Sequence, residues 1–183
     1  MTSQTDMMSP MQNTLSAWLH SLKHYLLMCV LLSSPERLVN HLNALVLTLA
    51  CYFLVGLLLV DAGRGYTEIS AQITIELSLL ALISYLILRW KKMLSRFQQT
   101  FSALLGVNMI ISFASLPLYR MSIGNPEDPD RLLITVTLVI LVWNLAAVSL
   151  IFKRAFDIST HLSAMLSFNY FVLLQFILYR LYQ

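Results

Sequence analysis

Charged side chains are scarce in this sequence. Only 11% of its 183 residues are Asp, Glu, Lys or Arg, and 58% are hydrophobic. A typical soluble domain is about 25% charged and about 45–50% apolar. This composition leaves too little polar surface to cover a soluble globule of this length, and it therefore argues against an ordinary water-soluble domain.

Net charge and cysteine are also low. The formal charge is +3, and the basic residues stand at the ends of apolar runs instead of gathering on one polar face. Nucleic-acid-binding surfaces need such a basic cluster, so we expect no nucleic-acid partner. Cys29 and Cys51 lie in apolar stretches without the spacing of a metal site or a redox pair. We expect both to be buried, unreactive thiols.

Catalytic motifs are missing as well. We find no glycine-rich phosphate loop, no HExxH, no nucleophile elbow and no paired carboxylates at a useful spacing. His20 and His24 are four residues apart and share a helical face, but no third metal ligand stands near them. A membrane enzyme normally collects His, Asp or Glu at one depth. The sequence predicts a protein that is not an enzyme, with no catalytic residues, no metal site and no cofactor.

Long apolar runs are what the sequence has in quantity. Residues 132–152 form 21 consecutive residues without a charge, preceded by Arg131 and followed by Lys153 and Arg154. A helix of about 20 residues crosses the roughly 30 Å hydrocarbon core of a bilayer. This run predicts a transmembrane helix.

Four further runs predict further spans. The connections between them are short and rich in Gly or Pro, as at 61–70 and 120–131, and no polar domain interrupts residues 34–183. The sequence therefore predicts an all-α, polytopic membrane helix bundle. Its five transmembrane helices are expected at about 42–60, 71–88, 100–119, 132–152 and 162–179.

The amino-terminal segment has a different character. Residues 1–14 are polar and read as a disordered tail, whereas residues 15–33 alternate apolar and polar positions at helical spacing before Pro35 breaks the pattern. We expect an amphipathic helix lying in the headgroup region. Aromatic and basic side chains favour that interface. The expected interfacial anchors are Trp18, Tyr25, Trp90, Lys91 and Lys92.

Basic residues predict the orientation. With the amino terminus inside, the inner segments hold eight Lys and Arg residues and the outer segments hold four. Short cytoplasmic loops are enriched in Lys and Arg. We therefore expect a cytoplasmic amino terminus and an extracytoplasmic carboxyl terminus.

Glu76 is the one acid inside a predicted span, and two interpretations stand beside each other. It lies about five residues, hence roughly 8 Å, from the start of the second span. It is either a proton or cation site, or a shallow carboxylate that reaches the headgroups or pairs with Arg120 or Arg131. The sequence favours the shallow carboxylate, because a conduction pathway is expected to contain a second acid deep in the membrane, and the spans hold none.

Polar, uncharged side chains also fall inside the spans. Such groups usually form hydrogen bonds between membrane helices, and the alternative is that they line a transport pathway. The small-residue pairs Ser102-x3-Gly106 and Ser163-x3-Ser167 favour close helix packing. Together with Glu76, the candidate intramembrane polar site comprises Asn108, Ser112, Asn144, Asn169 and Gln175.

Three stretches resemble the Yip family, the Ypt/Rab-interacting proteins and their bacterial relatives. They are LLSSPERL at 31–38, SFASLPLYR at 112–120 and VWNLAAVSLIFKRAFDISTHLSAMLSFNY at 142–170. The resemblance implies five spans, a cytoplasmic amino terminus and a place in membrane organisation, linked in eukaryotes to small GTPases. Ser34-Pro35-Glu36 stands here in place of the family's acidic Tyr-Gly-Pro-type motif.

These observations lead to two functional hypotheses. The first is a Yip-like protein of the bacterial inner membrane that acts as a membrane scaffold or as an accessory subunit of an envelope complex. Its partners would be the lipid bilayer and other membrane proteins or further copies of itself. The alternative is a small transporter or channel, acting as an oligomer, that uses Glu76 and the intramembrane Asn residues.

Overall fold

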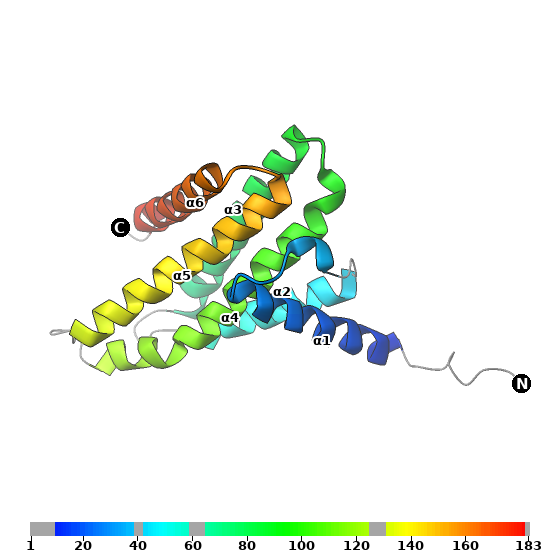
Figure 1. The fold of residues 1–183 in the computed structure, drawn as a ribbon. Helices are drawn as coiled ribbons and strands as arrows, with labels where there is room; N and C mark the ends of the chain where they lie inside the picture. Colours follow the sequence, from blue (N-terminus) through cyan, green and yellow to red (C-terminus); the bar gives the residue numbers. More distant parts are fainter. Residues whose placement is uncertain (1–9, 39–41, 59–64, 125–130, 182–183) are drawn as a thin grey trace, which may run out of the picture.

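The computed structural model describes residues 10–38, 42–58, 65–124 and 131–181, and these ranges form helices without strands (Figure 1). This confirms the predicted all-α class for the described part of the chain. Two short 3-10 helices, Pro35–Arg37 and Leu94–Arg96, precede α2 and α4. The α-helices are α1 (Pro10–Cys29), α2 (Leu42–Leu58), α3 (Tyr66–Trp90), α4 (Phe97–Gly124), α5 (Arg131–Phe156) and α6 (Thr160–Leu181).

Four segments are long and apolar enough to cross a membrane. They are Tyr66–Trp90, Leu94–Leu118, Arg131–Phe156 and Thr160–Leu181. These lengths suit a multi-pass membrane protein. The predicted span 42–60 corresponds to the shorter helix α2, whose 17 residues rise about 26 Å. Residues 59 and 60 lie outside the described ranges.

The helices extend beyond several predicted boundaries. α1 begins at Pro10, so the predicted tail is helical from there, and residues 1–9 lie outside the described ranges. Proline is tolerated at a first helical position, because the N–H that it lacks has no partner there. α4 continues to Gly124 through Pro117, although residues from 120 on were expected to be a loop. Proline removes one intrahelical hydrogen bond, and the helical turns on both sides of it persist.

α2 packs against α4, and hydrogen bonds join α4 to Leu38, which precedes α2, and to Leu58, where α2 ends. At one end the Gln99 side-chain amide donates to the Leu38 carbonyl at 3.1 Å. At the other end the Arg120 guanidinium donates to the Leu58 carbonyl at 3.1 Å. Residues 99 and 120 are about 32 Å apart along a helix. The segment that ends with α2 therefore covers a distance similar to the hydrocarbon thickness of a bilayer.

Small side chains form the contact between α5 and α6. The Ser149 and Ser163 hydroxyls are 3.1 Å apart, and the Ser167 hydroxyl donates to the Leu145 carbonyl at 2.9 Å. Both Ser163 and Ser167 are buried. The predicted packing role of this small-residue pair is confirmed, because the serines let the two backbones approach and satisfy their own hydroxyls in doing so.

α1 packs into the bundle through one buried face. The Tyr25 ring is fully buried, and its hydroxyl lies 2.5 Å from the Ser102 hydroxyl on α4. At the carboxyl end of α1 the Trp143 indole donates to the Cys29 carbonyl at 2.6 Å, which satisfies one of the last helical carbonyls. Tyr25 is therefore a core residue and not the interfacial ring expected from the sequence. The ring gains apolar contacts with α4 when it is buried, and the hydroxyl loses little by leaving the interface because it finds a hydrogen-bond partner in Ser102.

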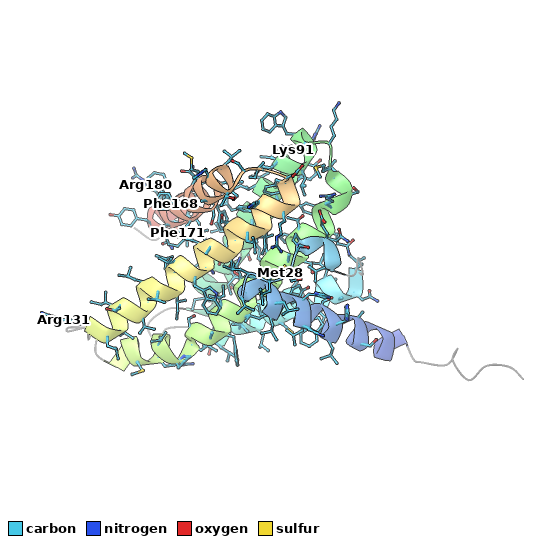
Figure 2. All side chains as sticks on the ribbon, in the orientation of Figure 1. Met28, Lys91, Arg131, Phe168, Phe171 and Arg180 are labelled. Atoms are coloured by element: carbon cyan, nitrogen blue, oxygen red, sulfur yellow. The ribbon has the colours of Figure 1, made fainter. Side chains whose placement is uncertain are left out.

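Charged residues gather at the two ends of the bundle. Lys91 and Arg131 lie at opposite ends, with Met28 between them near the centre (Figure 2). At the Lys91 end, Arg96 pairs with Glu36 at 2.8 Å, and Arg154 donates to the Ser33 carbonyl. The expected anchors Trp90, Lys91 and Lys92 are exposed at this end, whereas Trp18 is only partly exposed.

Candidate functional site

A cavity of about 550 Å³ lies among helices α2 to α6. About half of the side chains that line it are apolar, and the rest carry hydroxyl, amide or carboxyl groups. This volume is in the usual range of small-molecule pockets, about 300–1,000 Å³. The polar members are Tyr52, Gln72, Glu76, Asn108, Ser112, Ser115, Thr137, Asn144, Tyr170 and Gln175.

Glu76 lies inside α3 and lines the cavity. α3 begins at Tyr66, so Glu76 is ten residues into the helix, about 15 Å from its start. The polar turn YTEIS at 66–70, expected to be a loop, is helical, and the distance from Ala71, where the predicted span begins, to Glu76 stays roughly 8 Å. Within the described residues, neither Arg120 nor Arg131 forms an ion pair with Glu76. Tyr52 on α2 lines the same cavity and lies within electrostatic range of the Glu76 carboxylate.

A pair of side-chain amides joins α4 to α5 at the same cavity as Glu76. The Asn144 side-chain NH₂ donates to the Asn108 side-chain carbonyl at 3.1 Å. Asn108 is eleven residues from the start of α4, and Asn144 is thirteen from the start of α5, so each is about 17–20 Å into its helix. This contact is the interhelical hydrogen bond that the sequence predicted. Both residues also line the cavity, as does Ser112 one turn beyond Asn108.

Tyr170 contributes a polar group that lacks a protein partner. Its side chain is 7% exposed, and among the described residues its buried hydroxyl has no hydrogen-bond partner. Leaving a buried hydroxyl without a partner costs about 1–3 kcal/mol. The residue lines the cavity and lies within electrostatic range of Glu76. An unpartnered donor and acceptor beside a carboxylate is the arrangement expected of a site that awaits a ligand.

The two predicted site residues on α6 face different directions. Gln175 lines the cavity, whereas Asn169 is exposed on the surface of the bundle. Successive helical residues point about 100° apart, so Asn169 cannot share the inward face of its neighbour Tyr170. Five of the six predicted polar residues thus meet at one cavity, and Asn169 does not belong to it.

Sequence reasoning missed Gln72 and Tyr170. Gln72 precedes Glu76 by four residues, and this spacing places both on one face of a helix, which is a signal that could have found it. A tyrosine within a span is ordinarily assigned to an interface. For Tyr170 only the tertiary packing of α6 shows that its hydroxyl turns inward.

The cavity lining has a one-sided charge. Among the described residues that line it, Glu76 is the one with an acidic side chain, and none is Lys, Arg or His. Elsewhere in the described ranges no three His, Cys, Asp or Glu residues gather as metal ligands would. His20 and His24 contact each other, with 3.3 Å between their Nε2 atoms, at an exposed position on α1.

In comparisons with known proteins, no family model, no curated protein and no solved structure matches this chain.

Proposed function

We propose that this protein is a multi-pass membrane transporter that binds a small polar solute in the cavity among α2 to α6. The observation that carries the proposal is convergence. Polar side chains from five helices line one cavity near mid-helix, and the Tyr170 hydroxyl there has no partner within the described residues. Ionisable and polar groups at membrane depth are costly and typically mark substrate or ion pathways.

Packing alone does not account for this arrangement. The contact between α5 and α6 satisfies its serine hydroxyls directly, Ser149 with Ser163 and Ser167 with a backbone carbonyl. Ser84 and Trp18 also have buried polar atoms without a partner among the described residues, but of these unpartnered groups only Tyr170 lines the cavity. A scaffold needs no cavity, and it gains nothing from a buried hydroxyl without a partner. The cavity therefore favours the transporter hypothesis over the scaffold or accessory-subunit role. Membership of the Yip family stays a prediction from the three resembling stretches.

The proposed topology has five crossings. α2 would supply the first. This is supported by the contact of α2 with α4, by the hydrogen bond from Arg120 to Leu58 at the end of α2, and by the one from Gln99 to Leu38, which precedes α2. The end of the bundle that carries Lys91, Lys92, Lys153 and Arg154 would face the cytoplasm, in accord with the enrichment of basic residues there. The protein would thus sit in a bacterial inner membrane with its carboxyl terminus outside.

Solute uptake into proteoliposomes tests the proposed function. The purified chain would be reconstituted and offered labelled primary amines, amino acids, sugars and carboxylic acids in turn. We expect saturable uptake of one class and at least a tenfold loss of that uptake in Glu76→Gln and in Asn144→Leu, since both side chains line the cavity.

The matched control is Asn169→Ala, which removes an amide from the outward face of α6 and should leave uptake unchanged. Absence of saturable uptake for every class would contradict the proposal. Uptake by Glu76→Gln at the wild-type rate would also contradict it.

A further inference from the structure

We infer that the cavity is built for a small organic cation, with an ammonium group that meets Glu76 and Tyr170 and an apolar body that contacts the aliphatic lining. The inference rests on the proposed function, because it names the chemical class of the solute that the cavity takes.

The charge of the cavity lining favours a cationic ligand. Glu76 contributes a carboxylate, and none of the lining residues is basic. A carboxylate or phosphate ligand would therefore meet a like charge and find no cation to pair with in the lining. An ammonium group would instead form a charge-assisted hydrogen bond with Glu76, the strong class of such bonds.

The hydroxyl groups beside Glu76 suit an ammonium donor. Tyr52 on α2 lies within electrostatic range of the Glu76 carboxylate, whose two oxygens have several lone pairs that can accept ammonium protons. The Tyr170 oxygen has no partner in the described structure and can accept a second ammonium proton. An ammonium carries three donors, so it can bond Glu76 and Tyr170 together. The tyrosine rings add attraction for a cation placed over their faces.

Size and apolar lining argue against a bare metal ion. Ca²⁺ and Mg²⁺ take about six or more oxygen ligands, usually with several carboxylates or waters. This cavity holds one carboxylate in about 550 Å³, and Ile111, Leu141 and Leu178 are among the residues that line it. Those aliphatic side chains gain from contact with an apolar ligand body. The combination fits a monovalent organic amine.

Binding of three probes with nearly the same skeleton tests the inference. The probes are 2-phenylethylamine, 2-phenylethanol and 3-phenylpropionate, titrated by calorimetry into the full chain in detergent. We expect the amine to bind at least tenfold more tightly than the other two. Glu76→Gln should abolish this preference. Tyr170→Phe should weaken binding of the amine several-fold, because it removes the accepting oxygen.

The alcohol supplies the internal control. Its affinity should change less than threefold in Glu76→Gln, which shows that the variant is folded, and Asn169→Ala should bind all three probes like the wild type. Equal or tighter binding of the alcohol or the carboxylate would overturn the inference. So would a folded Glu76→Gln chain that keeps the amine preference, or a folded wild type that binds no probe. Saturable uptake of a neutral solute without amine binding would overturn the cation assignment and leave the transporter proposal standing.

Discussion

Single residues in this bundle differ in whether their surroundings satisfy them. Asn108 and Asn144 form a hydrogen bond across two helices, whereas the Tyr170 hydroxyl, in the same cavity as Glu76, has no partner among the described residues. The sequence shows that all four are polar and that the first two can pair. It cannot show which of them meet, because that depends on how each helix is rotated about its axis. Tyr25 shows the same limit, since its burial depends on its contact with α4.

The Asn108–Asn144 hydrogen bond should contribute measurably to stability. We expect Asn144→Ala to lower the free energy of unfolding by about 0.6–2 kcal/mol, the range found for polar contacts between membrane helices. Unfolding in mixed micelles with increasing SDS would measure it. In a double-mutant cycle, adding Asn108→Ala should cost little more, because the partner is already gone. Fully additive losses would show that the two amides do not interact.

At the scale of helices, the sequence predicts spans well and boundaries less well. The apolar runs 71–88 and 132–152 lie inside α3 and α5, because a long apolar run is by itself a strong signal for a helix that can cross a membrane. Helix ends depend on local capping and on contacts outside the bilayer, so α3 begins earlier and α4 ends later than expected. α1 differs most, since its mixed pattern suits a membrane surface, yet its buried face packs against α4.

The α1–α4 contact depends on the absence of a side chain at Gly106. A Cβ there would collide with the Tyr25 ring, whereas a Cβ at Gly65 would only make an ordinary 3.5 Å contact with Thr67. We expect Gly106→Ala to lower the thermal unfolding midpoint in detergent, at a cost of about 1–3 kcal/mol for overpacking. Gly65→Ala is the matched control and should leave the midpoint within experimental error. Equal midpoints for the two variants would refute this packing.

The whole molecule brings five predicted polar residues from four helices to one place. Two features made that convergence hard to predict. In each span alone, the few polar residues are explained by ordinary packing between helices. In addition, apolar helices can be rotated about their axes in many ways that bury a similar area. We expect this interior cavity to be open to a small polar solute.

Cysteine accessibility in reconstituted vesicles measures whether the cavity is open to such a solute. Cys51→Ala provides the background, because Cys29 is buried and its burial raises the thiol pKa to about 11, which keeps it protonated and unreactive. Ser112→Cys, Gln175→Cys and Asn169→Cys would each be treated with 2-aminoethyl methanethiosulfonate in reconstituted vesicles. We predict that the cysteines at the cavity positions 112 and 175 are modified and that 2-phenylethylamine slows their modification. The cysteine at position 169, which would face lipid, should stay unmodified. Modification of position 169 as fast as the other two, or of none of the three, would contradict the account.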